Sequence, residues 1–359
     1  MPESEKISLE QYMSNGVQNI VKNAIKATIK NPKEGLFWAK YAVSAKQAAK
    51  RRHELECKDE HVPSFLIASI TQSCNLSCAG CYANANAGCE NDTMTAEEWR
   101  RIFDEAESLG VSMILIGGGE PLTRPEVIKE AAEKPNIVFP IFTNGTMFDS
   151  THLKMFEKHH NLVPIISIEG GKNTTDARRS EGVYDKTQEA MTALEKVGLL
   201  FGTSITVTPD NLEEVTQNIF IENLRKKGCR VVLFIEYVPI NEGDIALSPN
   251  QSAILDERVK GFRQSFDDMI IISFPGDEKE AGGCLAAGRG FVHINASGGA
   301  EPCPFSPYSD TNVKEIGLRK ALKSPLFTKL IDTGILQTEH SGGCVLFYRQ
   351  DEVQQLISE

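Results

Sequence analysis

Six short apolar runs alternate with helical patterns between residues 63 and 275, and this alternation constrains the fold more than any other feature. The runs lie near residues 65–70, 111–116, 137–142, 163–168, 200–207 and 230–237. Between the first two, Thr95 and Glu98 form a capping box that predicts a helix ending before Gly110. Another helix is expected between the last two runs, over residues 212–227. Short apolar strands that alternate with helices predict an α/β fold with a parallel sheet. Six units are too few for a closed barrel of eight strands.

Three cysteines, Cys74, Cys78 and Cys81, follow the first of these runs. Cysteine thiolates are the usual ligands of iron–sulfur clusters, and a tight loop can bring three of them to three corners of a [4Fe–4S] cube. The fourth iron is then open to a substrate or cofactor. The alternative is a structural zinc site, which closes with four ligands and usually has two spaced pairs of cysteines. Cys57 or Cys89 would have to supply the fourth ligand.

The spacing Cx3CxxC, followed by the aromatic Tyr82 and preceded by an apolar strand, resembles the signature of the radical S-adenosylmethionine (SAM) superfamily. The resemblance implies an open, partial (β/α)6 TIM-like barrel and a [4Fe–4S] cluster whose open iron binds SAM. It also implies reductive cleavage of SAM to a 5′-deoxyadenosyl radical, which takes a hydrogen atom from the substrate. An external electron donor, such as a ferredoxin or flavodoxin, is an implied partner.

The segment GGGEP at residues 117–121 follows the second predicted strand. Glycines let the backbone approach a ligand closely, and a carboxylate or carbonyl there can accept a hydrogen bond from an ammonium group. The resemblance assigns the binding of the SAM amino group to Gly118, Gly119 and Glu120. An ordinary glycine-rich turn is the alternative.

Polar residues also follow the third and fourth predicted strands. The resemblance implies an active-site role for Asn144 in TNGT and contact with SAM or substrate for Glu169 in SIEG. A generic Asn-Gly turn and an exposed loop acid are the alternatives. By the same resemblance, Arg178 or Arg179 pairs with the SAM carboxylate. Of the two, we include Arg178 among the predicted cofactor-binding residues.

The fifth and sixth predicted strands supply further candidates. Ser204 and Thr206 are two residues apart and therefore share one face of a strand. By resemblance, such a hydroxyl contacts the SAM ribose, with Ser204 favoured, and the segment around Val238 lies against the adenine. A buried apolar strand end explains Val238 almost as well. Tyr82 completes the predicted cofactor-binding residues.

The C-terminal segment contains three more cysteines, Cys284, Cys303 and Cys344. Residues 291–295 predict a strand and residues 297–299 a hairpin turn, so that Cys284 and Cys303 lie at a β-ribbon. The pattern resembles the SPASM and twitch extensions, which carry auxiliary iron–sulfur clusters. A full SPASM domain has seven cysteines, and therefore one auxiliary cluster is expected here, with an open iron or a non-cysteine fourth ligand. Buried thiols are the alternative.

The predicted organisation is a helical extension at residues 1–62, the partial barrel at 63–275 and an α+β auxiliary-cluster domain at 276–359. SPASM and twitch relatives mostly modify peptides or proteins, which is the leading substrate class. A small molecule, such as a cofactor precursor or a lipid or isoprenoid chain, is the second. A non-catalytic iron–sulfur carrier is the hypothesis from another class; a carrier has no use for the GGGEP segment.

Composition limits the partners. The net charge of −11 argues against nucleic-acid binding. Nine cysteines with no signal peptide or apolar run of about 18 residues favour a reducing, cytoplasmic location. Residues 16–53 contain nine Lys or Arg against the single acid Glu34. They predict a helix pair that either packs on the main domain or lies on an anionic membrane or acidic partner.

Overall fold

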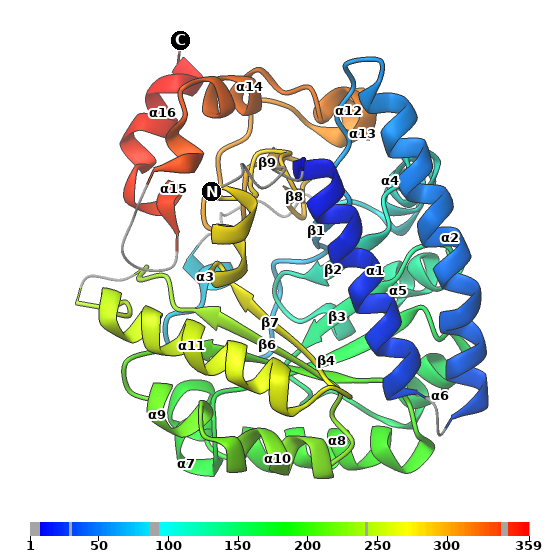
Figure 1. Ribbon diagram of the computed structural model, residues 1–359, viewed down its shortest axis with the longest axis vertical. Coiled ribbons are helices and arrows are strands. Elements are labelled where there is room, and N and C mark those ends of the chain that lie inside the picture. The colour runs from blue at the N-terminus through cyan, green and yellow to red at the C-terminus, as the bar shows by residue number, and fades with distance from the viewer. Residues whose placement is uncertain (1–7, 29–30, 86–92, 241–242, 339–343, 359) are drawn as a thin grey trace, which may run out of the picture.

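The computed structural model describes residues 8–28, 31–85, 93–240, 243–338 and 344–358. Its centre is one sheet whose strands run β7-β6-β5-β4-β3-β2-β1-β8-β9 (Figure 1). The strands are β1 (Phe65–Ser69), β2 (Met113–Gly117), β3 (Phe139–Thr143), β4 (Leu162–Ile168), β5 (Gly202–Val207), β6 (Val231–Glu236), β7 (Ile270–Phe274), β8 (Phe291–Ile294) and β9 (Ala300–Glu301). Strands β1 to β8 pair in parallel and only β9 is antiparallel, so the carboxyl ends of the barrel strands meet at one edge.

Helices follow most of the strands, as a chain of β–α units requires. They are α3 (Tyr82–Ala85), α4 (Ala96–Leu109), α5 (Pro125–Ala132), α6 (Ser150–Lys158), α7 (Lys172–Arg179), α8 (Val183–Val197), α9 (Leu212–Val215), α10 (Asn218–Lys226) and α11 (Pro249–Ser265). The predicted capping box at Thr95 and Glu98 opens α4, and Gly110 ends it in a left-handed conformation. This α/β half-barrel confirms the predicted fold class.

The two faces of the sheet have separate cores. In β4, Leu162 and Ile166 belong to the main core with the helices that follow the strands, whereas Val163 and Ile165 belong to a second core. Alternate residues of a strand point to opposite faces, which accounts for the division. The second core is completed by α1 (Leu9–Ala27) and α2 (Pro32–Glu56). The N-terminal helices therefore cover the face of the half-barrel that the other helices leave open.

The apolar side chains of α1 and α2 are used in this packing. Trp38 and Tyr41 are each 1% exposed, and Arg52 of the same helix is buried, donating to Ser112 Oγ over 3.0 Å. The other described Lys and Arg residues of the segment, such as Lys22 and Lys46, are at the surface. The structure thus supports the packed extension. No helix in the described part of the chain is long and apolar enough to cross a membrane.

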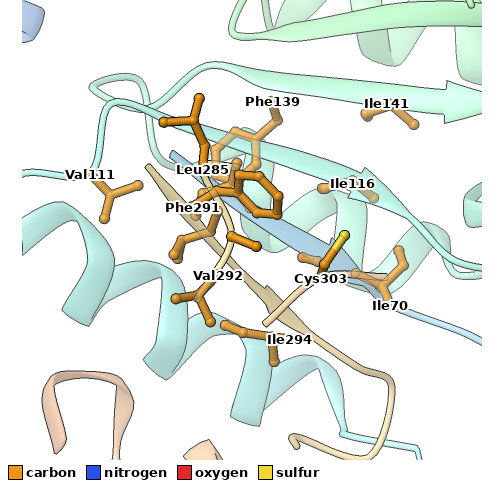
Figure 2. Close-up of a cluster of buried hydrophobic side chains, with 14 of the residues drawn as sticks. Ile70, Val111, Ile116, Phe139, Ile141, Leu285, Phe291, Val292, Ile294 and Cys303 are labelled. Carbon is orange, nitrogen blue, oxygen red and sulfur yellow. The ribbon is translucent and has the colours of Figure 1, made fainter. Parts of the chain in front are cut away.

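The C-terminal segment continues the sheet of the barrel. Strand β8 pairs in parallel with β1, and β9 returns beside it as the predicted ribbon. Figure 2 shows Phe291 and Leu285 from this segment packed with Phe139 of the barrel in one buried cluster. The remaining elements are η1 (Pro121–Thr123), η2 (Gly276–Ala281), η3 (Ile335–Gln337), α12 (Val313–Ile316), α13 (Leu318–Ala321), α14 (Pro325–Asp332), α15 (Val345–Tyr348) and α16 (Gln350–Ser358).

Two local expectations need correction. The sheet has a further parallel strand, β7, which pairs with β6 from Val231–Ile270 to Ile235–Phe274, so the half-barrel extends beyond six strands. The apolar run before Pro275 carries this strand. The helix expected over residues 212–227 is broken into α9 and α10, because the backbone at Gln217 is extended.

Candidate functional site

The three cysteines of the first motif lie on the loop between β1 and α3, at the carboxyl edge of the sheet. Cys74 is exposed, and Cys78 and Cys81 are half-buried. Partial burial raises the pKa of Cys78, while Arg179 and Arg178 oppose this shift. Cationic neighbours favour the thiolate, which is the form that binds metal.

Two arginines at the end of α7 connect this loop to β4 and β5. Arg178 donates to Glu169 Oε1 over 2.6 Å, to Thr206 Oγ1 over 3.1 Å and to the carbonyl oxygen of Gly80 over 3.3 Å. Arg179 Nε also donates to Glu169 Oε1, over 2.7 Å. Glu169 is 1% exposed, so the alternative of an exposed loop acid is wrong. Its carboxylate positions both arginines beside the cysteine loop.

The glycine-rich segment is paired through its backbone with the residues that precede Cys74. The Gly119 N–H donates to Thr71 O over 2.7 Å, and the Glu120 N–H donates to Ser73 O over 2.9 Å. A Cβ atom on Gly119 would overlap the Ser73 carbonyl oxygen, and one on Gly118 would overlap that of Thr71. The glycines are thus required for the close approach of two backbones, and they fix the base of the cysteine loop.

The Glu120 carboxylate lies inside the protein and is fully engaged there. Oε1 accepts from Leu122 N over 3.0 Å and from Thr143 Oγ1 over 2.7 Å, and Oε2 accepts from Asn144 N over 2.8 Å. Burial raises the pKa of Glu120, and these three hydrogen bonds oppose the shift. Asn144 in turn donates to Asn75 Oδ1 over 2.9 Å and lies 3.9 Å from Cys74 Sγ. The acid therefore holds the loop after β3 against the cysteine loop.

The remaining predicted residues follow neighbouring strands. Ser204 is buried and its hydroxyl lies 3.1 Å from that of Ser167 on β4. Thr206, two residues further along β5, joins the Arg178–Glu169 network described above. Val238, two residues after the end of β6, is 2% exposed and belongs to the main core. The structure therefore brings Thr206 to the arginine network and places Ser204 beside Ser167.

Tyr237 belongs to the segment that the resemblance places against the adenine, but its contact with the cysteine loop was not predicted from the sequence. A Cβ atom on Gly80 would overlap the ring of Tyr237, so this ring lies directly against the cysteine loop. The Arg178 guanidinium lies 6.0 Å from the ring centroid, and the hydroxyl donates to Asp244. Gly80, with a φ of 63°, was the available signal, since it stands between two cysteines where only a residue without a side chain fits.

The C-terminal cysteines gather at a second place. Cys284 follows η2, Cys303 follows β9, and Cys344 directly precedes α15. Their exposed fractions are 8%, 1% and 5%. Cys303 interacts electrostatically with both Cys344 and Cys284. Burial raises the pKa of Cys284 well above its ordinary value, as expected for thiols that lie together away from water. Three residues far apart in the sequence thus form one buried thiol cluster.

A short connection joins the two cysteine sets. Tyr82 directly follows Cys81, and its ring packs edge-on against Phe305, two residues after Cys303, with 5.3 Å between ring centroids. Tyr82 is also hydrogen-bonded to Ser69 and to the Gly118 backbone. The second cysteine set therefore adjoins the strand ends of the barrel.

A buried hydrogen-bonded chain, also not identified from the sequence, continues from Ser69 into the ribbon. Ser69 Oγ lies 2.7 Å from His293 Nε2, and His293 Nδ1 lies 2.7 Å from Glu301 Oε2. Asn295 donates to the other oxygen of Glu301 over 2.6 Å. These residues tie β8 and β9 to the end of β1.

The three cysteines of this loop are the type of ligand that iron–sulfur clusters take. Among the described residues, no three His, Cys, Asp or Glu side chains are grouped so as to hold one metal ion. A cluster distributes its protein ligands over separate irons, so its cysteines need not converge on one point. Cys74, Cys78 and Cys81 would hold the cluster, and Arg178, Arg179 and Asn144 flank the loop that presents it.

Comparisons with known proteins identify the family of the chain. Residues 68–220 match the model of the Radical SAM superfamily. The PqqA peptide cyclase of Gluconobacter oxydans is 30% identical over 288 residues, which cover 74% of this chain and 78% of that protein. An AdoMet-dependent heme synthase of Methanosarcina barkeri is 24% identical over 306 residues, covering 76% and 86%.

The fold is also found among solved structures. Streptococcus suis SuiB bound to S-adenosylmethionine aligns with a TM-score of 0.66 at 17% sequence identity, covering 79% of this chain and 72% of that chain. Fold, cysteine motif and sequence similarity define an enzyme built on a cluster-binding half-barrel. The chain belongs to the radical SAM superfamily, whose members use a [4Fe–4S] cluster and SAM.

Proposed function

We propose that this radical SAM enzyme modifies a peptide or protein. The observation that carries the SAM chemistry is the joining of the cysteine loop, the glycine-rich segment and the Arg178–Glu169 network at one edge of the sheet. The peptide substrate is supported by the similarity to the PqqA peptide cyclase over three-quarters of the chain. The second cysteine set beside the barrel supports a reaction that involves a further cluster.

When bound, the first cluster supplies the electron that breaks the C–S bond of SAM and so initiates hydrogen abstraction. The residues of the chain do the binding and orientation. We assign the backbone of Gly118 and Gly119 to the SAM amino group and Arg178 to its carboxylate. Glu120 and Glu169 position these groups, because their carboxylates are engaged by protein donors rather than turned towards a ligand. Asn144 contacts the loop at Cys74.

A single auxiliary cluster at Cys284, Cys303 and Cys344 is the second part of the proposal. The three thiols lie together, and burial protects such a cluster from solvent. Among the described residues, the ring contact between Tyr82 and Phe305 connects this cysteine set to the first loop. Counting iron in the wild type and in the triple Cys→Ala variant tests this part: the variant must lose about one four-iron cluster. Equal iron contents would remove the auxiliary cluster.

The first experiment tests the SAM chemistry. Protein purified without oxygen is reconstituted with iron and sulfide, reduced with dithionite and supplied with SAM. We expect 5′-deoxyadenosine from the wild type and none from Cys78→Ala. If a fully loaded wild type yields no product, a SAM-binding titration distinguishes a need for substrate from an incorrect assignment. No SAM binding would overturn the assigned SAM site.

A small molecule is the second candidate substrate, favoured by the similarity to the AdoMet-dependent heme synthase along 86% of that protein. The two classes are separated by adding extract from the source cells to the assay. Stimulation of 5′-deoxyadenosine formation that disappears after protease treatment of the extract supports a peptide. Stimulation that survives the protease and passes a small-pore membrane favours the small molecule.

Membrane contact through residues 16–53 has less support. The apolar side chains that would enter a lipid surface, including Val17, Val21 and Trp38, are buried against the sheet. Flotation with anionic vesicles tests the question directly, and we expect the protein to stay unbound.

A further inference from the structure

A buried acid lies against the C-terminal cysteine cluster. Glu278 belongs to η2 and is 5% exposed, six residues before Cys284. Its carboxyl group accepts a hydrogen bond from the backbone N–H of Leu285, the residue after Cys284, over 3.1 Å, and it interacts electrostatically with Cys284 and Cys344. The carboxyl group thus lies beside the backbone that follows Cys284, within electrostatic range of two of the three proposed cluster ligands.

The protein provides this acid with little compensation for its burial. Glu278 Oε1 accepts one backbone hydrogen bond, from Leu285 N over 3.1 Å. In the described part of the chain no cation lies within ion-pair distance of its carboxylate. Arg289 attracts the carboxylate from farther away and donates instead to the carbonyl oxygens of Cys284 and Ala281. An ionised carboxylate away from water is costly unless it is paired or coordinates a metal.

The proposed auxiliary cluster lacks one protein ligand, which a carboxylate could supply. Three cysteines occupy three irons of a [4Fe–4S] cluster and leave the fourth without a protein ligand. Carboxylate oxygen is an established ligand of iron in proteins. The short η2 helix holds Glu278 in place from both sides: Gly283 N donates to its carbonyl oxygen over 3.3 Å, and Tyr12 of α1 donates to that of Asp277 over 2.9 Å.

We propose that Glu278 is the fourth ligand of the auxiliary cluster. The inference rests on the proposed cluster at Cys284, Cys303 and Cys344 and specifies its chemistry. A cluster closed by a carboxylate has no iron free for substrate, and its role is then electron transfer or structure. An oxygen ligand in place of a thiolate also raises the reduction potential, as substitution by histidine does in other clusters.

The test isolates the auxiliary cluster in the full chain by replacing Cys74, Cys78 and Cys81 with Ala. In this parent we compare Glu278→Gln, Glu278→Cys and the control Glu280→Gln, whose side chain is exposed two residues away. Iron and sulfide per chain are measured before and after mild ferricyanide oxidation. The electron paramagnetic resonance spectrum and the midpoint potential of the reduced cluster are recorded for each variant.

We expect the parent and Glu280→Gln to keep about four irons through oxidation. Glu278→Gln is expected to lose one iron and give a three-iron cluster. Glu278→Cys is expected to keep four irons with a changed spectrum and a more negative potential, because the fourth ligand becomes a thiolate. If Glu278→Gln does not fold, the midpoint potential of Glu278→Cys tests the ligand assignment.

Two results would overturn the assignment while leaving the auxiliary cluster intact. One is a Glu278→Gln cluster with the iron content, spectrum and potential of the parent. The other is an unchanged potential in Glu278→Cys. A parent that binds no iron would instead refute the auxiliary cluster itself, and the ligand assignment with it, while the 5′-deoxyadenosine assay would still report on the first cluster.

Discussion

Arg178 and Gly80 are hydrogen-bonded, with the guanidinium donating to the glycine carbonyl oxygen over 3.3 Å. The contact is reinforced by the backbone, since Ala79 N donates to the Arg178 carbonyl oxygen over 2.9 Å. The end of α7 and the cysteine loop thus hold each other at two points. A side chain assigned to the SAM carboxylate also sets the conformation of the loop that presents the cluster.

Arg178→Lys tests this double role. An ammonium group cannot reach Glu169, Thr206 and Gly80 at once, because the planar fork of arginine is lost. A hydrogen bond to a charged group contributes about 1.5–3 kcal/mol, so we expect SAM affinity to fall by about tenfold or more. A SAM titration of the reconstituted protein measures this, with Arg225→Lys, which replaces a surface partner of Asp268, as control. Unchanged affinity in Arg178→Lys would contradict the assignment.

Glu169→Ala is expected to destabilise the fold. It leaves Arg178 and Arg179, whose side chains are 17% and 11% exposed, without their shared carboxylate. Removing one partner from a buried ion pair costs about 3–5 kcal/mol, and the residual exposure places this site at the lower end. Urea unfolding of the cluster-free protein gives the value. The matched control is Glu213→Ala, which removes a 70% exposed partner of Arg258 and should cost at most about 1 kcal/mol. Equal costs would show that the Glu169 pair is not a buried anchor.

Gly119→Ala and Gly117→Ala form a pair that differs in what the added methyl group meets. At Gly119 it overlaps the Ser73 carbonyl oxygen, whereas at Gly117 its nearest neighbour is the Tyr82 hydroxyl at 3.7 Å. We expect Gly119→Ala to displace the cysteine loop and lower the iron bound by the first cluster by more than half after reconstitution. Gly117→Ala should bind iron as the wild type does. Similar iron contents in both variants would show that the close backbone approach is not needed for the cluster.

The lowered pKa of Glu60 predicts that the stability of the fold depends on pH. The hydrogen bond from Arg319 holds the pKa of Glu60 at about 2, below its ordinary value of 4.5. Because the folded-state pKa is lowered, the stabilisation is fully present above about pH 4.5 and is lost as the pH falls towards 2. Glu60→Gln lacks this contribution, so we expect its cluster-free form to lose less stability than the wild type across that window. Urea unfolding at several pH values compares the two; parallel curves would contradict the assigned pairing.

The sequence was sufficient for the parts of the fold that depend on local pattern. Strand β1 and the capped helix α4 were expected within a residue or two, because apolar runs and capping residues are local signals. The pairing of β8 with β1 was not predicted. Register between segments more than 200 residues apart is decided by shared packing, here of Phe65 against Phe291, and no single segment shows it.

The site likewise has features that the sequence predicts and features that only the fold shows. Cysteine spacing and the GGGEP segment identify the chemistry, since each is a local arrangement of ligands and glycines. The networks of Glu169, His293 and Glu278 could not be predicted, because a polar side chain's partners come from distant segments, and Glu278, in the charged run 277–280, looks solvated in the sequence. Only the fold shows that each of these side chains is buried beside a partner from another element.

His293 provides a final prediction about how the ribbon is attached to the barrel. His293→Leu removes the imidazole from between Ser69 and Glu301 and leaves the buried Glu301 carboxylate with the hydrogen bond from Asn295, which should cost about 3 kcal/mol in urea unfolding of the cluster-free protein. Replacing Glu301 with Leu as well removes the unpaired charge, so the double variant should lose less than the sum of the single losses. His53→Leu, at an exposed pair with Glu10, should cost less than about 1 kcal/mol. Additive losses would show that His293 and Glu301 do not act as a pair.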